Sequence, residues 1–156
     1  MKKVFWVLTL LIAGLGTVPT DAARRTIDVN KAGDKKPTAS AETGIKFTEA
    51  SWKEILQKAK AEKKVIFFDA YASWCGPCKM MQKNVFTQKS VGDLYNSKFI
   101  NVKMDMEKGE GPSLSAVYPL EAYPTLMFID GNGRVLKKVI GGMSAEDLIS
   151  LGKSIR

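Results

Sequence analysis

The feature that most constrains this chain is a pair of cysteines placed between a short apolar run and an amphipathic segment. Cys75 and Cys78 are separated by a Gly-Pro pair and are the chain's 2 cysteines. The continuous apolar run 65–68 precedes them and is typical of a strand buried on both faces. A helical pattern follows over 79–86. A central strand is therefore predicted to carry both thiols to the start of a helix, a context that favours redox chemistry.

Strands and helices alternate over the rest of the region 45–156. Ser51 with Glu54 forms a capping-box pattern before a first helix, and Ser144 precedes a last one. Shorter helical stretches are predicted over 91–95 and 113–118, and further strands over 99–106, 125–129 and 135–140, with a hairpin turn at 130–133. The fold class is α/β, with a central mixed sheet flanked by helices on both faces.

Composition excludes several classes of function. A chain of 156 residues has the length of about one domain. With 0 His and 2 Cys, one chain lacks the ligands for a zinc centre or an iron–sulfur cluster, so no metal or cofactor is expected. The net charge of +8 comes from scattered lysines without a nucleic-acid motif, which indicates a solvated basic surface and no nucleic-acid binding.

The first residues have the order of an export signal. Lys2 and Lys3 precede an apolar run of about twelve residues and then small residues up to Ala22, which predicts a signal peptide over 1–22. An uncleaved N-terminal anchor is the alternative. The polar segment 23–44 is predicted to be a flexible linker to a domain spanning 45–156. The expected location is periplasmic or otherwise extracytoplasmic.

The position of Cys75 at the predicted start of a helix affects how easily its thiol ionises. The free N–H groups and the dipole of a helix N-terminus favour an anion, so Cys75 should lose its proton more readily than a free thiol. Two other interpretations stay open at this point. The pair could form an inert disulfide, although closing so short a loop stabilises by only about 2 kcal/mol. It could also form half of a metal clip completed by another molecule.

The segment 68–79, FDAYASWCGPCK, resembles the thioredoxin family, together with Tyr123-Pro124-Thr125 and the glycines at 141–142. The resemblance covers about 45–156. It is strongest to exported members and to the periplasmic reducing domain of the membrane thiol reductase, which shares the stretch 84–91. A thioredoxin-like fold is implied.

The resemblance also implies roles for single residues. Cys75 would be the exposed nucleophile and Cys78 the buried resolving thiol. Asp69 would accept the Cys78 proton, and a carboxylate beside four apolar residues should have a raised pKa. Pro124 would be a cis-proline, leaving the backbone of Tyr123 free to pair with a substrate strand.

Further substrate contacts are expected at the rim of the site. Trp74, Gly76, Pro77 and Gly141 are assigned to substrate binding, whereas Trp52 is expected in the core. In the family a lysine accompanies the buried carboxylate, and no lysine of this sequence matches its position clearly. Asn101 falls near its place, and Lys103 lies two residues along the same strand face.

The Gly-Pro pair resembles reducing members of the family. The predicted function is therefore an exported thiol-disulfide oxidoreductase that reduces disulfides of exported proteins, with the membrane thiol reductase as electron donor. A monomer is expected. The alternatives are a disulfide oxidase or isomerase of the same compartment, and a non-catalytic peptide-binding or chaperone module.

Overall fold

The computed structural model describes residues 43–156 of the chain. The expected signal peptide 1–22 and nearly all of the expected linker 23–44 lie outside the described residues. Within 43–156, no helix is both long and apolar enough to cross a bilayer.

The centre of the structure is a sheet of mixed direction. Its strands are β1 (Val65–Tyr71), β2 (Phe99–Asp105), β3 (Thr125–Ile129) and β4 (Val135–Ile140), in the spatial order β2-β1-β3-β4. β1 pairs in parallel with β2 and antiparallel with β3, and β3 pairs antiparallel with β4. The mixed sheet expected from the sequence is confirmed, and the strand that leads to the cysteines lies in its interior.

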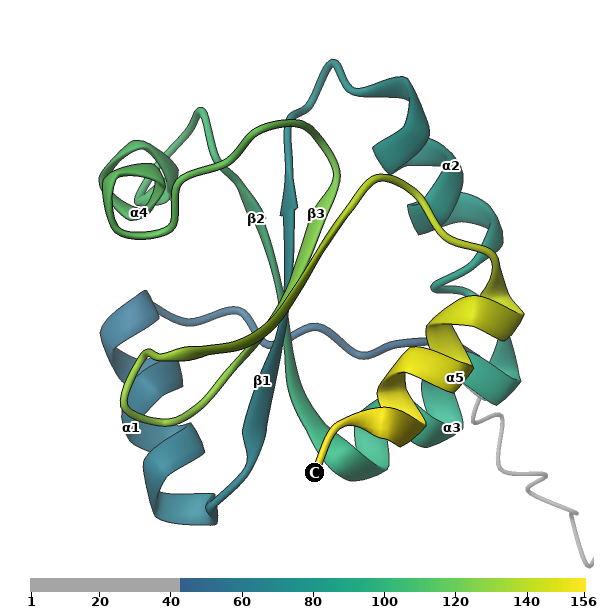
Figure 1. Cartoon of the computed structure of the whole chain (residues 1–156), viewed down its shortest axis with the longest axis horizontal. Coiled ribbons are helices and arrows are strands. Elements are labelled where there is room, and N and C mark those ends of the chain that lie inside the picture. The colour runs from purple at the N-terminus through teal and green to yellow at the C-terminus, as the bar shows by residue number, and fades with distance from the viewer. Residues whose placement is uncertain (1–42) are drawn as a thin grey trace, which may run out of the picture. The chain divides into compact units, whose positions relative to one another are not determined.

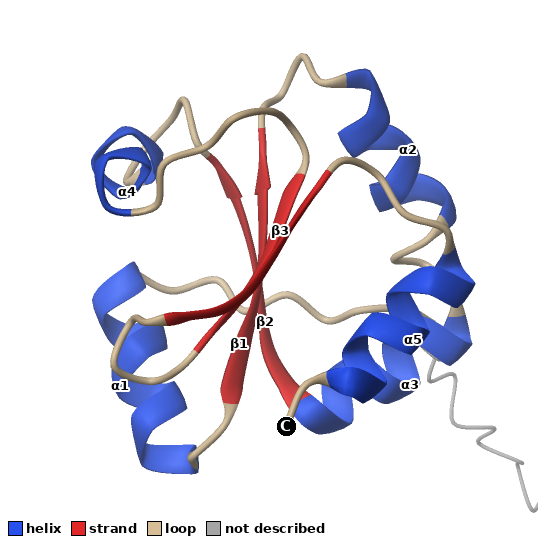
Figure 2. Ribbon diagram, in the orientation of Figure 1, coloured by secondary structure: helices blue, strands red, loops and turns tan. Residues whose placement is uncertain are grey.

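Helices cover both faces of this sheet. They are α1 (Trp52–Glu62), α2 (Gly76–Asn84), α3 (Lys89–Lys98), α4 (Gly111–Val117) and α5 (Ala145–Ser154). Figure 1 shows α1 and α4 on one face and α2, α3 and α5 on the other, and Figure 2 shows the strands of the sheet between these two layers. The α/β class with helices on both faces is confirmed.

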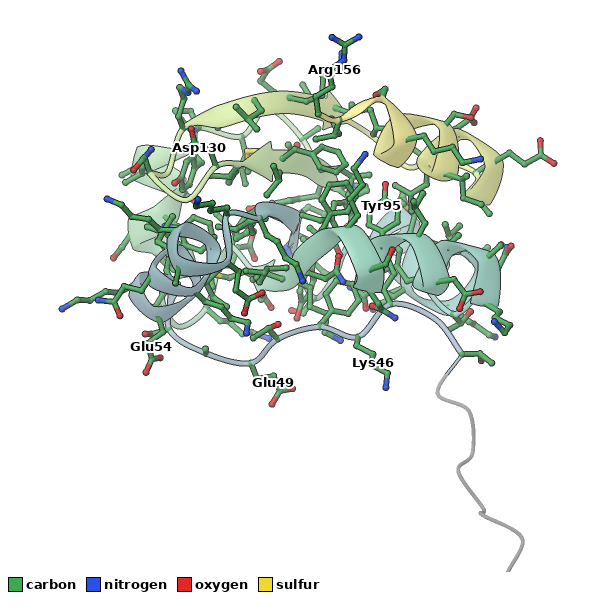
Figure 3. All side chains as sticks on the ribbon, turned by 90° about the horizontal axis from the view of Figure 1, so that it is seen from below. Lys46, Glu49, Glu54, Tyr95, Asp130 and Arg156 are labelled. Carbon is green, nitrogen blue, oxygen red and sulfur yellow. A yellow bond between two sulfur atoms is a disulfide. The ribbon has the colours of Figure 1, made fainter. Side chains whose placement is uncertain are left out.

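Each face of the sheet has its own apolar core because side chains alternate along a strand. On β1, Ile66 and Phe68 join the core under α1 and α4, where Trp52 packs edge-on against Phe68. Phe67 points to the opposite core, where it packs against Tyr95 of α3. The Tyr95 hydroxyl donates to the Leu148 carbonyl of α5 at 2.8 Å, so it ties these two helices together (Figure 3).

Local signals define most of the element boundaries. Ser51 and Glu54 form both hydrogen bonds of the predicted capping box, and the Ser144 hydroxyl accepts the Asp147 N–H. The Asp130 carboxylate accepts N–H groups of Asn132 and Arg134 and closes the predicted hairpin (Figure 3).

Two helices begin earlier than the apolar pattern predicts. α4 starts at Gly111 instead of 113, and α2 starts at Gly76 instead of 79. In both helices a proline lies in the first turn, where its missing N–H leaves no helical hydrogen bond unmade. Apolar periodicity does not reveal such a turn, because glycine and proline add no large apolar side chain to the helical pattern.

Candidate active site

The two cysteines lie at the connection from β1 to α2 and in the first turn of α2. They form a disulfide with a Cα–Cα distance of 5.3 Å. Cys75 is the N-cap residue of α2, and its sulfur accepts the Cys78 backbone N–H at 3.2 Å. This N–H is one of the donors that a helix start leaves without an intrahelical partner. The nucleophile predicted from the sequence therefore lies in contact with the positive end of a helix.

The two cysteines differ in their access to the cavity beside the disulfide. Cys75 is 3% exposed and Cys78 is 1% exposed in the disulfide. Cys75 nevertheless lines a cavity of about 440 Å³, and Cys78 is not among the residues that line it. The expectation of an exposed Cys75 is thus wrong for the disulfide, because neighbouring groups cover its sulfur. The remaining lining residues are Trp74, Gly76, Pro77, Leu120, Glu121, Ala122 and Tyr123.

The opposite wall of this cavity is formed by residues of the segment just before β3. The Tyr123–Pro124 peptide bond is cis, as the resemblance to the family implied. Tyr123 is half-buried and Pro124 is buried. The Gly141 N–H donates to the Pro124 carbonyl at 2.8 Å, and Gly141 has a φ of +97°, which favours glycine. The structure therefore brings the predicted residues from β1–α2, β3 and the end of β4 to one edge of the sheet.

Trp74 lies at the rim of the cavity and is held in place by Glu107 and Tyr123. It is 66% exposed. Its indole N–H donates to the Glu107 carboxylate at 2.8 Å, and its ring meets Tyr123 edge-on at 5.9 Å. The Lys108 ammonium donates to the Ser73 hydroxyl at 3.0 Å. The segment after β2 thus fixes the loop that carries the cysteines.

Asp69 lies on β1 beneath α2. It is 1% exposed, and neither carboxylate oxygen accepts a hydrogen bond from any group that the structure describes. Burial raises the pKa of Asp69 to about 7, a rise that the Gln82 amide and the Lys103 ammonium oppose only in part. Gln82 lies near the carboxylate without hydrogen-bond geometry and follows Cys78 by one helical turn. Asp69 therefore faces the side of α2 that carries Cys78.

The register of β1 and β2 identifies the lysine beside this carboxylate. Asp69 is paired with Lys103, whereas Asn101 is paired with Phe67. The Asn101 amide donates to the Lys46 carbonyl and to Asn96, so it anchors the segment before α1. The expectation that Asn101 falls near the place of the family's lysine is therefore corrected. A parallel register cannot be read from one strand alone, because it depends on how both strands are offset.

The family model for thioredoxin matches residues 43–154. That match spans both sheet faces and every residue of the site.

The chain belongs to the thioredoxin family.

Three relatives show how far this family membership extends. Thioredoxin H1 of Arabidopsis thaliana is 33% identical over 108 residues, which are 69% of this chain and 89% of that protein. The solved structure of a candidate disulphide isomerase from Bacteroides thetaiotaomicron is 44% identical, with a TM-score of 0.64 and coverage of 73% of this chain and 97% of that one. The thiol:disulfide interchange protein DsbD of Pseudomonas fluorescens is 29% identical over 93 residues, 58% of this chain but 16% of DsbD.

As a thioredoxin-like protein with a Cys-x-x-Cys pair, the chain is a protein-disulfide oxidoreductase. Its chemistry needs two sulfurs that exchange between thiol and disulfide, and the described structure holds them in that arrangement. In residues 43–156 there is no group of three His, Cys, Asp or Glu side chains that could hold a metal ion.

Sequence reasoning missed part of the surface around this thioredoxin-like site. Leu120 and Ala122 line the cavity, although only the neighbouring Tyr123 was expected there. Met80 and Met81 both lie in the helical pattern predicted over 79–86, but Met81 is buried and Met80 is 60% exposed. Consecutive helical residues point about 100° apart, and in α2 this rotation turns Met80 away from the core that Met81 enters.

Proposed function

We propose that this thioredoxin-family protein is an exported reductase of protein disulfides. The observation that supports this most is the position of Cys75: its sulfur caps α2, and the residue borders an open cavity that is also lined by Tyr123, the residue before the cis Pro124. A cysteine at a helix start is a stronger nucleophile at neutral pH because more of it is thiolate.

The first step is attack by the Cys75 thiolate on one sulfur of a substrate disulfide. The substrate S–S bond breaks, a new S–S bond joins Cys75 to the substrate, and the other substrate sulfur leaves as a thiolate that takes up a proton. Cys75 is the attacking residue because it borders the cavity, whereas Cys78 lies behind it.

The second step releases the substrate. Asp69, in its ionised form, accepts the Cys78 proton, and the Cys78 thiolate attacks the sulfur of Cys75. The Cys75–substrate bond breaks and the Cys75–Cys78 disulfide forms. The substrate disulfide has then gained two electrons and two protons, and the protein dithiol has lost them. A pKa of about 7 suits Asp69 to this transfer because both of its forms are populated near neutral pH.

Substrate contacts are assigned to the rim of the cavity. Trp74, Gly76 and Pro77 form one wall, and all three are exposed. Tyr123 lies on the other wall, with the buried Pro124 next to it in the chain, and the Tyr123 backbone is the expected partner of an extended substrate strand. Gly141 supports that wall through its hydrogen bond to Pro124.

The reducing direction requires a source of electrons outside the cytoplasm. A thioredoxin-like potential near −270 mV lies about 150 mV below a strong periplasmic oxidant, which corresponds to roughly 7 kcal/mol for two electrons. The likeness to DsbD and the signal-like residues 1–22 favour a membrane thiol reductase as donor. The substrates would be disulfides of exported proteins.

The Cys75/Cys78 potential tests the direction. We expect a value near −270 mV when the protein is equilibrated with reduced and oxidised glutathione and the thiols are counted after trapping. A value above about −150 mV would contradict a reductase and favour an oxidase.

Disulfide isomerisation is a second candidate, favoured by the likeness to the candidate disulphide isomerase of Bacteroides thetaiotaomicron. Cys78→Ser separates the two. An isomerase needs only the nucleophile, so the variant would still refold scrambled ribonuclease, whereas a reductase would lose more than about 90% of insulin reduction. Cys75→Ser should abolish both activities. Insulin reduction by the unaltered protein that is no faster than in the two variants would instead favour the non-catalytic peptide-binding module.

A further inference from the structure

The two ends of the sheet in the described domain differ in charge. At the end opposite the cysteines, α1 leads into β1, α3 leads into β2, and α5 ends. Figure 1 shows the α1–β1 connection and the C-terminus at its lower end and the connection from β1 to α2 at its upper end, and Figure 3 views the domain from the lower end. We call the lower end the basic pole. It is defined by Lys58, Lys60, Lys63, Lys64, Lys153 and Arg156.

Contacts between distant segments bring these residues to one end. Val65, which follows Lys64, is paired with Phe99 at the start of β2. The ammonium of Lys98, the residue before Phe99, donates to the Gly152 carbonyl of α5 at 2.9 Å. The ends of α1 and α5 therefore lie at the same end of the sheet, although they are far apart in the sequence.

Carboxylates neutralise only part of the basic pole. Glu62 is the one acidic residue of 58–64, and it pairs with Lys58 and Lys64. In residues 43–156 no carboxylate pairs with the ammonium of Lys60 or Lys63, and both lysines are exposed. The bonding capacity of these two ammonium groups is therefore left to solvent or to a partner.

A shallow depression of about 270 Å³ lies between this part of α1 and the turn that joins β3 to β4. Lys60, Lys63 and Lys64 line it together with Asp130 of the turn. Asp130 pairs with Arg134, so its charge is compensated within the turn. No aromatic side chain lines the depression on which a nucleic-acid base could stack.

The cysteine end of the domain has the opposite sign of charge. The connections 105–111 and 118–124 lie beside the cysteine pair, and Lys108 is their one basic residue. Their acidic residues are Asp105, Glu107, Glu110 and Glu121. A surface of negative charge therefore attracts one end of the domain and repels the other.

The chain also enters the described domain beside the basic pole. Thr43 is the first described residue, and three residues later Lys46 lines a depression of about 220 Å³ with Lys58 and Lys64. The signal-like residues 1–22 thus precede a segment that reaches the domain next to these lysines. Such a residue order brings this end of the domain close to a membrane, which favours a bilayer over an acidic protein as the partner.

We propose that the basic pole lies on the anionic headgroups of a phospholipid bilayer and turns the Cys75 cavity away from the lipid. Lysines near an anionic bilayer each add to the attraction without needing a fixed geometry, which suits ammonium groups spread over several segments. The acidic cysteine end is repelled by the same surface, so one orientation is favoured. Cys75 then stays accessible to proteins on the aqueous side.

The test maps lysine acetylation in the full-length, disulfide-bonded protein. Sulfo-N-hydroxysuccinimide acetate is added with vesicles of phosphatidylcholine, or of phosphatidylcholine with about 30% phosphatidylglycerol, and mass spectrometry gives the rate at each lysine. Both vesicles offer the same apolar interior, so a difference reports headgroup charge. We expect acetylation of Lys60, Lys63 and Lys64 to be about fivefold slower with the anionic vesicles. Lys79 and Lys108 at the cysteine end should change by less than about twofold.

Two matched variants separate the basic pole from net charge. In Lys60→Gln/Lys63→Gln, the protection of Lys64 should fall to within about twofold of that with phosphatidylcholine vesicles. Lys79→Gln/Lys83→Gln removes the same charge from exposed sites on α2 and should keep the protection of Lys64. Equal urea midpoints would show that both variants are folded. Adding about 1 M NaCl should abolish the protection, because it shortens the range of electrostatic attraction to about 3 Å.

Several results would overturn the proposal without touching the chemistry of the cysteines, since the test needs no disulfide exchange. Equal acetylation with both vesicles would show that the basic pole is only a solvated surface. Protection of Lys79 and Lys108 as strong as that of Lys60 would contradict the orientation. Protection by soluble polyglutamate but not by anionic vesicles would assign the basic pole to an acidic protein.

Discussion

At the scale of single residues, Asp69 is the group whose environment departs most from that of an ordinary side chain. It is buried on a strand between apolar residues, without a hydrogen-bond partner in the described region. Ionising such a carboxylate costs free energy, because water no longer solvates the charge. The same property that suits Asp69 to proton transfer therefore destabilises the fold at high pH.

The sign of this effect follows from linkage. The pKa of Asp69 is about 7 in the folded chain, compared with 3.8 for an aspartate that is not buried, as in the unfolded chain. Between these two pH values the folded state therefore binds more protons than the unfolded state. The free energy of unfolding therefore falls as pH rises from about 4 to 7 and stays low above that. The difference in pKa corresponds to roughly 4 kcal/mol.

Asp69→Asn should remove this penalty. We expect the variant to be more stable than the natural protein by about 2–4 kcal/mol at pH 8 and by little at pH 4, because the amide carries no charge at either pH. Urea unfolding at the two pH values measures this. Asp93→Asn, a change at an exposed carboxylate of α3 that pairs with Lys89, is the control for the loss of one negative charge. Equal gains at pH 4 and pH 8 would contradict the assignment.

At the scale of elements, α2 combines structural and chemical roles. Its first turn contains Pro77, and its N-cap is the sulfur of Cys75. A helix that begins with serine or aspartate satisfies its first N–H groups in the same way. Here the capping atom is also the reacting atom, so stabilising the helix and stabilising the thiolate are one interaction.

This predicts that Cys75 ionises more readily in the folded protein than in the unfolded chain. In Cys78→Ser, the rate of alkylation by iodoacetamide should rise with pH through a midpoint below about 8.5, the value for a free thiol. The same variant in 8 M urea provides the control, because it has no helix. Identical midpoints in the folded and unfolded protein would contradict a role for α2 in activating Cys75.

At the scale of the whole domain, one sheet separates two apolar cores. Ile55 of α1 lies in one core and Leu148 of α5 in the other, and both are fully buried. Each strand of the interior contributes to both cores through alternate side chains, as Phe67 and Phe68 show. Neither core can open without exposing the strands that the other one needs.

The described domain should therefore unfold as one cooperative unit. Ile55→Val should cost about 0.5–1.5 kcal/mol and Leu148→Ala about 2–5 kcal/mol. Because the two sites share no partner, the cost in the double variant should be the sum to within about 0.5 kcal/mol. Urea unfolding followed by both fluorescence and circular dichroism measures this. Separate transitions in the two signals would show that the cores unfold independently.

Much of this protein was determined by local sequence. The apolar run of β1, the capping boxes, the Asp130 turn and the Cys-x-x-Cys pair each depend on neighbours within a few residues, so they could be predicted, as could the raised pKa of a carboxylate within an apolar strand.

Other features depended on contacts between distant segments. The pairing of Asp69 with Lys103 follows from the offset of two strands, and the bond from Trp74 to Glu107 joins residues that no periodicity connects. The hydrogen bond from the Met143 N–H to the Met81 sulfur likewise exists only because the connection after β4 lies against α2. Short-range sequence therefore determined which groups react, and tertiary structure decided what surrounds them, because register and packing depend on the whole chain.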